Sequence, residues 1–242
     1  MSKPGWLALV GGAEFRAGCD EADRLLIGAA AGAGTHVTIV PTAAAAEGAP
    51  HLAAANGVRH FNRLGADASG VMIVDAITAN DPSLALPLES ARLIYIAGGD
   101  PGYLVQSLRG SLAWRAMLDA WRGGAVLAGS SAGAMALCEA MWNPYARRIE
   151  AGLGVVKRAA VIPHHRPGSE WVEHLRDALG NDSIILGIVE QTALIWDGTA
   201  WRVVGPGAVT SYVGDQVVTY RPGGGFTLDV ILQVNHDSAE PA

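Results

Sequence analysis

The sequence has 242 residues, of which half are hydrophobic and 17% are charged, with 17 Lys and Arg against 23 Asp and Glu. This composition is typical of a compact globular protein and excludes a disordered chain. The net charge is −6 and no basic tract is longer than a pair such as Arg147-Arg148, so we expect no nucleic-acid partner. Two cysteines, Cys19 and Cys138, are too few for a disulfide framework and fit a reduced compartment.

The N-terminus lacks the basic and long apolar segments of a signal peptide, and no apolar run reaches the ~20 residues of a membrane span. We therefore expect a cytoplasmic protein without membrane contact. No linker or internal repeat divides the chain. The prediction is a single domain over residues 1–234, followed by a polar tail over 235–242.

The first half of the chain alternates predicted strands and helices. The strands are expected at 6–10, 36–40, 71–74, 93–96 and 125–128. The helices are expected at 20–31, 51–64, 100–109 and 112–121. Apolar strands separated by helices favour an α/β fold with a doubly wound, largely parallel sheet and helices on both faces. Reactive loops lie at the carboxyl ends of such strands.

The pattern changes after residue 149. A strand at 159–162 leads into Pro163-His164-His165, and a helix is expected at 170–179. Further strands are predicted, with glycine-rich turns between some of them, at 184–189, 193–196, 201–204, 217–220 and 226–231. We expect these strands to form an antiparallel C-terminal extension of the same sheet.

Gly129-Ser130-Ser131-Ala132-Gly133-Ala134 is the most informative motif, because an apolar strand precedes it and a helix, expected over 135–142, follows it. A strand that turns into a helix through G-x-S-x-G is a nucleophile elbow, with the serine at the helix N-terminus. Amide groups and the helix dipole there favour an oxyanion. The prediction is a nucleophilic Ser131 rather than a plain tight turn.

A serine nucleophile needs a base. Of the seven histidines, those at 36, 51, 60, 174 and 236 are expected to be structural, surface or tail residues. His164 and His165 instead follow an apolar strand. From the residues alone, these two histidines could include the catalytic base or could be a solvent-exposed pair in a loop. Metal binding is disfavoured because no cluster of Cys, His or Asp with ligand spacing is nearby. Neighbours on an extended segment point to opposite sides, so only one of the two can face the serine.

The acid that would orient the base has several candidates. Glu190 interrupts an apolar stretch, where a carboxylate is costly unless it is hydrogen-bonded. Glu150, in the loop between the serine and the histidines, is the alternative. Glu139 is expected on the helix after the serine and to face away.

The chain resembles the cyanophycinase and peptidase E family of serine hydrolases, which have a class I glutamine amidotransferase-like fold. The resemblance spans nearly the whole chain and rests on five motifs in order: Gly11-Gly12-Ala13-Glu14, Ile96-Ala97-Gly98-Gly99-Asp100 with Leu104, Gly129 to Ala134, Pro163-His164, and Gly187 to Leu194. It implies Ser131 as nucleophile, His164 as base, Glu190 as orienting acid, and the amides of Gly99 and Ala132 as oxyanion hole.

The reaction that this resemblance implies is hydrolysis of a peptide or isopeptide bond through an acyl-enzyme, without a metal or organic cofactor. Candidate substrate contacts are Gly98, Asp100, His165 and Arg166. Because Arg166 can present a guanidinium to a carboxylate, we expect short acidic peptides as substrates.

Three departures bear on the substrate. Cyanophycinases typically carry Gly-Gly-Asp-Gln and Asp-Gln-His-Phe with several following arginines, where this chain has Gly98-Gly99-Asp100-Pro101 and Ile162-Pro163-His164-His165-Arg166. The Gly-Gly-Gly-Asn of peptidase E is not matched either. Cleavage of a β-linked Asp-Arg polymer or dipeptide is therefore the alternative activity, and a non-catalytic amidotransferase-like binding domain is the alternative of another class. A homodimer is the candidate assembly, and exo- against endo-cleavage is left open.

Overall fold

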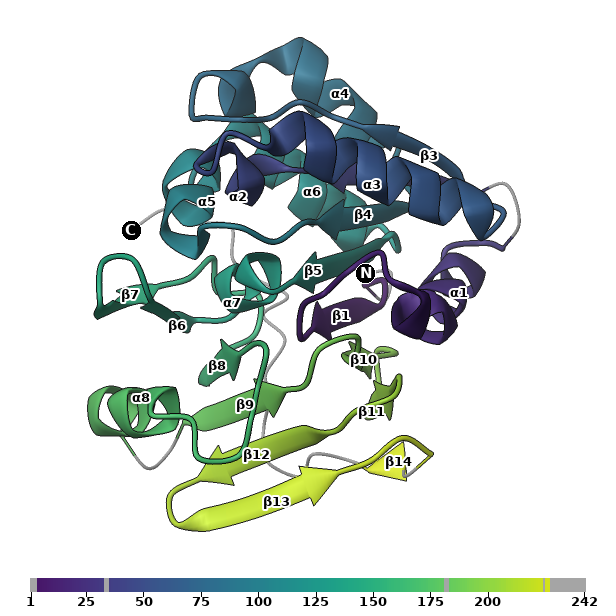
Figure 1. Ribbon diagram of the computed structural model, residues 1–242. Coiled ribbons are helices and arrows are strands. Elements are labelled where there is room, and N and C mark those ends of the chain that lie inside the picture. Colours follow the sequence, from purple (N-terminus) through teal and green to yellow (C-terminus); the bar gives the residue numbers. More distant parts are fainter. Residues whose placement is uncertain (1–3, 33–34, 181–182, 224, 227–242) are drawn as a thin grey trace.

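The computed structural model describes residues 4–32, 35–180, 183–223 and 225–226, arranged as a central sheet with helices on both faces and a second, smaller sheet beside it (Figure 1). The predicted polar tail, and the predicted strand at 226–231 apart from its first residue, lie outside the described residues.

The central sheet has the strand order β14-β11-β10-β1-β5-β4-β2-β3. The strands from β1 to β3 in this order are parallel, and β10, β11 and β14 add to the edge beside β1 as antiparallel strands. Their bounds are β1 (Leu7–Val10), β2 (His36–Val40), β3 (Asp67–Gly70), β4 (Leu93–Ile96), β5 (Val126–Ser130), β10 (Ala193–Trp196), β11 (Trp201–Val204) and β14 (Gly225–Phe226). This confirms the predicted sheet and its antiparallel extension.

Both faces of this sheet are buried. In β1, Leu7 and Leu9 belong to one hydrophobic core, whereas Ala8 and Val10 belong to another on the opposite face. The first core includes residues of α4 to α7, and the second includes residues of α1 and α3. Alternate side chains of a strand point to opposite faces, so burial on both sides accounts for the nearly unbroken apolar runs in the sequence.

Helices follow most strands of the central sheet. Several begin at a capping side chain: Asp81, Asp100 and Ser111 accept hydrogen bonds from the first-turn amides of α4, α5 and α6. The helices are α1 (Asp20–Ala29), α2 (Thr42–Ala45), α3 (Pro50–Arg63), α4 (Pro82–Glu89), α5 (Pro101–Leu108), α6 (Leu112–Arg122), α7 (Ala132–Leu137) and α8 (Trp171–Leu179), with short 3₁₀ turns η1 (Ala17–Cys19) and η2 (Thr78–Asn80).

A second sheet has the order β13-β12-β9-β8, with bounds β8 (Ala159–Ile162), β9 (Ile184–Ile188), β12 (Val209–Val213) and β13 (Gln216–Tyr220). The expectation that every C-terminal strand extends the first sheet is thus wrong for β9 and β13. The reason is that β9 pairs with β8 and β12, and α8 covers this sheet with a small core of its own that includes Val172 and Leu175.

Two further elements differ from the prediction. The third strand is 67–70 rather than 71–74, because Asp67–Gly70 is the segment in register with β2, and beyond it the Val71 amide adds a hydrogen bond to the Ile39 carbonyl of β2. The helix after Ser131 ends at Leu137, and the chain then forms a hairpin of β6 (Ala140–Asn143) and β7 (Arg148–Ala151). Strand pairing there overrides a helix-forming composition.

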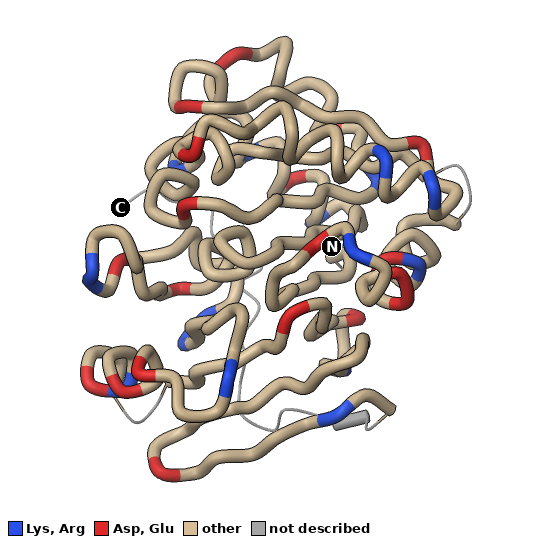
Figure 2. Tube along the Cα trace, in the orientation of Figure 1, with Lys and Arg blue, Asp and Glu red and all other residues tan. Residues whose placement is uncertain are grey.

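Basic and acidic residues are scattered over the described trace (Figure 2). No helix among the described residues is long and apolar enough to cross a membrane.

Candidate active site

Ser131 lies between β5 and α7, in a strained turn. Its φ of 49° and ψ of −110° fall outside the regions that non-glycine residues ordinarily adopt. The flanking glycines make the turn feasible: a Cβ on Gly129 would lie 2.5 Å from the carbonyl carbon of Gly133, and a Cβ on Gly133 would lie 2.5 Å from the Ile96 oxygen. The sequence motif and the observed geometry are those of a nucleophile elbow.

His164 follows β8 and also has a left-handed φ, of 51°. Its amide donates to the carbonyl of Gly11 at 2.7 Å, at the end of β1. The ring packs on Gly12, where a Cβ would lie only 2.3 Å from Cε1 of the imidazole. The loop after β1 therefore packs against the imidazole and holds the His164 backbone in place.

A chain of hydrogen bonds joins three of the predicted side chains. Oγ of Ser131 lies 3.0 Å from Nε2 of His164, and Nδ1 of His164 lies 2.7 Å from Oε1 of Glu190. A carboxylate only accepts, so Nδ1 carries the proton and donates it to Glu190. That tautomer leaves Nε2 free to accept the hydrogen bond from the Ser131 hydroxyl. The side chains of His164 and Glu190 are 47% and 50% exposed, so the site opens to solvent.

The other carboxylates considered for the acid are engaged elsewhere. Glu150 on β7 accepts hydrogen bonds from Asn143 at 3.0 Å and Arg148 at 2.8 Å, and these donors lower its pKa. Glu139 is not on a helix as expected. It follows α7 and accepts a hydrogen bond from the Arg158 amide. The structure brings Glu190, and neither of these, to His164.

Two backbone amides near the serine have no acceptor among the described residues. They belong to Gly99 and to Ala132, the first residue of α7. Gly99 has a φ of 139°, and a Cβ there would lie 2.3 Å from the Ala43 backbone, so the loop after β4 requires glycine. Free amides at a helix N-terminus suit a developing oxyanion.

A cavity of about 860 Å³ contains Ser131 and His164 in its wall, together with Gly98 and Gly99. The loop after β1, α3 and the segment before β7 contribute further wall residues, and single residues come from α2, α5, α7 and α8. Of the predicted substrate contacts, Gly98 lines this cavity, whereas Asp100, His165 and Arg166 do not.

The three residues outside the cavity wall have other contacts or face solvent. The Asp100 carboxylate accepts from the Tyr103 amide as the cap of α5. His165 is 5% exposed, packs on Gly187, and pairs through Nε2 with the Tyr212 hydroxyl at 3.0 Å. Burial lowers the pKa of His165. Arg166 is exposed to solvent.

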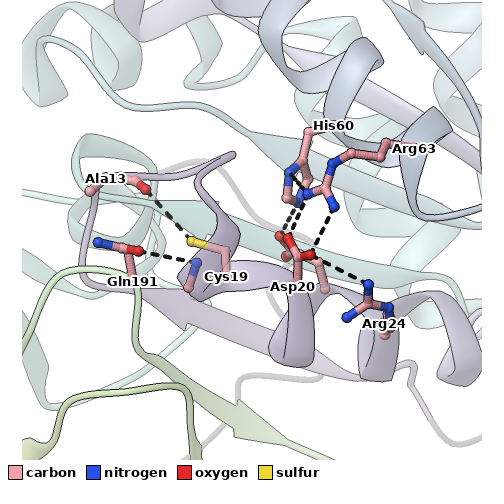
Figure 3. Close-up of polar contacts among 9 residues, drawn as sticks. Ala13, Cys19, Asp20, Arg24, His60, Arg63 and Gln191 are labelled. Carbon is pink, nitrogen blue, oxygen red and sulfur yellow. Dashed lines mark hydrogen bonds and ion pairs between the residues drawn. The ribbon is translucent and has the colours of Figure 1, made fainter.

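Cationic side chains that were not predicted line the cavity instead. They are Arg16, in the loop after β1, and Arg59 and Arg63, one turn apart on α3. Figure 3 shows Arg63 in a two-pronged ion pair with Asp20, at 2.8 and 2.6 Å. Arg59 donates to the neutral Asn56, and the Arg16 side chain pairs with no described residue. The i,i+4 spacing on α3 was a visible signal, but nothing in the sequence placed that helix beside Ser131.

His60, also in the cavity wall, is 3% exposed. Its Nε2 lies 2.7 Å from the buried Asp23 carboxylate. Its Nδ1 faces the Arg63 guanidinium, which can only donate, so Nε2 carries a proton toward Asp23. Burial raises the pKa of Asp23. His60 therefore braces α3 against α1, in agreement with the structural role expected for it.

Both cysteines are buried. Burial raises the pKa of Cys19 to about 12 and that of Cys138 still higher. Within the described ranges, no group of three or more His, Cys, Asp and Glu side chains is placed to hold a metal ion.

Comparison with known proteins finds relatives over most of the chain. The chain is 25% identical to the cyanophycinases of Trichormus variabilis and Nostoc sp., in matches that cover 84% of this chain and 71% of theirs. It is similar to the crystal structure of a peptidase from an acI-B1 actinobacterium, with a TM-score of 0.82, 29% identity, and coverage of 93% and 97%. A putative peptidase E protein from Listeria monocytogenes shares the fold, with a TM-score of 0.58, 18% identity, and coverage of 90% and 98%.

Residues 7–204 match the model of peptidase family S51. The match includes Ser131, His164 and Glu190 and every strand of the central sheet except β14. With a serine in the elbow of an amidotransferase-like fold, the chain belongs to peptidase family S51 and is a serine hydrolase.

Proposed function

We propose that Ser131, His164 and Glu190 form a catalytic triad that hydrolyses peptide or isopeptide bonds of short peptides. The observation that carries the proposal is the continuous chain of hydrogen bonds, 3.0 and 2.7 Å long, from the elbow serine to the Glu190 carboxylate. A nucleophile bonded to a base, and a base bonded to an orienting group, is the arrangement that activates a hydroxyl.

Acylation begins when Ser131 Oγ attacks the carbonyl carbon and its proton passes to His164 Nε2. The carbonyl oxygen becomes an oxyanion and accepts hydrogen bonds from the Gly99 and Ala132 amides. Collapse of the tetrahedral intermediate breaks the C–N bond, and the proton on Nε2 goes to the leaving amine. Glu190 keeps Nδ1 protonated and stabilises the imidazolium that forms in between.

Deacylation repeats these steps with water. His164 Nε2 takes a proton from the water as its oxygen attacks the acyl ester. The second tetrahedral intermediate releases the carboxylic acid and returns the proton to Ser131. The chemistry balances without a metal or organic cofactor.

The cations of the cavity wall support an acidic substrate. Arg16 and Arg59 have no carboxylate partner, whereas Arg63 is paired with Asp20. A guanidinium binds a carboxylate in a two-pronged geometry that sets direction as well as affinity. We therefore assign the acidic preference to Arg16 and Arg59 in place of Arg166.

A peptide screen tests the function. The panel holds dipeptides with acidic and neutral side chains on either side of the bond, together with β-Asp-Arg and cyanophycin. We expect turnover of short acidic peptides that Ser131→Ala lowers by ~10⁴–10⁶-fold, since triad members act as a unit. Arg59→Ala should raise KM for acidic peptides, with Arg166→Ala as the matched control outside the cavity wall.

Other results of this screen would indicate a different function. Cleavage of cyanophycin without turnover of acidic dipeptides identifies a cyanophycinase-type activity. A protein that binds these peptides and reacts with no serine-directed probe is a binding domain on a hydrolase fold. Undiminished turnover by Ser131→Ala contradicts the triad.

A further inference from the structure

The Glu14 carboxylate bridges the two segments that border the proposed reaction centre. Its Oε1 accepts a hydrogen bond from the Gly98 amide at 2.9 Å, and its Oε2 accepts one from the Ser130 hydroxyl at 2.9 Å. Gly98 immediately precedes Gly99, and Ser130 immediately precedes Ser131. One side chain thus joins the loop that carries one oxyanion donor to the strand that carries the nucleophile.

The bridge lies in a closely packed part of the molecule. A Cβ built on Gly98 would lie 3.0 Å from Glu14 Oε1 and 3.2 Å from Ser131 Cβ. The Ser130 side chain is fully buried, so its hydroxyl depends on a protein acceptor. Among the described residues no cation lies within ion-pair distance of Glu14, and the hydrogen bonds to its carboxylate come from neutral donors.

The backbone around Glu14 is held in an unfavourable conformation. Ala13 and Phe15, on either side of it, have φ values of 51° and 64°. Left-handed backbone costs a non-glycine residue about 1–2 kcal/mol. Such strain persists only where surrounding contacts impose it. Two contacts hold this loop: Cys19 Sγ lies against the Ala13 carbonyl, and the Gln191 backbone amide donates to the Gly12 carbonyl. The loop therefore aims the carboxylate in a fixed direction.

We propose that Glu14 is a positioning residue that fixes the distance between the Gly99 amide and Ser131 Oγ. It acts through Gly98 and Ser130 and does not touch the reacting atoms. Its hydrogen-bond acceptance matters, rather than its charge. The proposal rests on the proposed function, because it assumes that Ser131 is the nucleophile and Gly99 an oxyanion donor.

Two variants separate hydrogen bonding from charge. Glu14→Ala removes both hydrogen bonds. Glu14→Gln is neutral but keeps an acceptor oxygen for the Gly98 amide and a donor nitrogen for the Ser130 oxygen. Glu139→Gln is the matched control, since the Glu139 carboxylate also accepts a hydrogen bond from a backbone amide, that of Arg158, and lies outside the cavity wall.

The measurements are kcat and KM on the best peptide of the screen, the rate of labelling by a fluorophosphonate, and the circular dichroism spectrum. We expect Glu14→Ala to lower kcat and the labelling rate by ~10²–10³-fold, as loss of an oxyanion donor does, with little change in KM. Glu14→Gln and Glu139→Gln should stay close to the parent protein. Ser130→Ala, which removes one of the two hydrogen bonds, should be intermediate.

Three results would overturn the proposal. The first is parental kcat and labelling in Glu14→Ala. The second is a kcat of Glu14→Gln as low as that of Glu14→Ala, together with a raised KM. That result would mean that the carboxylate binds a cationic group of the substrate. The third, decisive if Glu14→Ala fails to fold, is a parental labelling rate in Ser130→Ala. Ser131→Ala is measured alongside and tests the proposed function separately. If Ser131→Ala kept its activity, Ser131 would not be the nucleophile, whatever the result for the Glu14 variants.

Discussion

The contact between Gly12 and His164 makes a quantitative prediction. A methyl group at position 12 would lie 2.3 Å from Cε1 and 2.6 Å from Nε2 of the imidazole. Carbon atoms in contact are separated by about 3.5–4.0 Å, so the ring must retreat by about 1.2 Å or more. Ser131 Oγ is 3.0 Å from Nε2 now, and a retreat of that size breaks the hydrogen bond. A misplacement of ~1 Å can cost ~10²-fold in rate, so we expect kcat/KM of Gly12→Ala to fall by about that factor.

The variant also strains the backbone, because Gly12 has a φ of 107°. Gly124 supplies the matched control, since its φ is 108° and no atom lies within 4 Å of a Cβ built there. Both substitutions should destabilise the fold by ~1–3 kcal/mol. That loss lowers Tm by about 2–4 °C per kcal/mol in a chain of this size. Only Gly12→Ala displaces His164.

The assay is peptide hydrolysis and fluorophosphonate labelling of both variants, normalised to the folded fraction from thermal unfolding. We expect Gly124→Ala to keep the parental rate per folded molecule and Gly12→Ala to lose it. Equal rates in the two variants would mean that backbone strain alone explains the loss and that the Gly12–His164 contact does not position the imidazole.

Further predictions concern the acid, a buried base and the thiols. Glu190→Gln should keep the fold and lower kcat by ~10⁴-fold through the wrong tautomer, while Glu150→Gln stays near the parental rate; the reverse would exchange their roles. Burial holds the pKa of His165 below its unfolded value, so the unfolded chain binds the extra proton and stability falls as pH drops through about 6.5. Thermal unfolding between about pH 8 and 5.5 should therefore lose less stability in His165→Asn, and an equal loss would contradict this. Iodoacetamide should leave activity unchanged because Cys19 and Cys138 are buried thiols, and inactivation would point to a cysteine nucleophile.

Much of the fold could be predicted because the parallel strands are buried on both faces. That burial leaves short apolar runs ending in glycine or serine, such as β4 before Gly98 and β5 before Ser131. β3 was misplaced because Asp67–Gly70 is polar and the strand signal lies just beyond it. The β6–β7 hairpin was missed because its pairing is a tertiary effect.

The sequence predicted which side chains lie near Ser131 at the end of the strands, but not which residues form the cavity wall. The G-x-S-x-G motif and Pro163-His164 pointed to residues that the structure places in hydrogen-bond contact. Arg166 was expected to contact the substrate because it is close to His164 in the sequence. The arginines that line the cavity, Arg16 and Arg59, are each more than a hundred residues from His164 in the sequence. Distance along the chain carries no information on which loops meet at one edge of a sheet.

Covalent labelling shows whether Ser131 is the nucleophile. The full chain is incubated with a fluorophosphonate, and intact mass followed by peptide mapping locates the adduct. We predict one adduct, on Ser131, that is absent from Ser131→Ala and forms much more slowly in His164→Ala. An unlabelled parent protein, or an adduct that persists in Ser131→Ala, would contradict it.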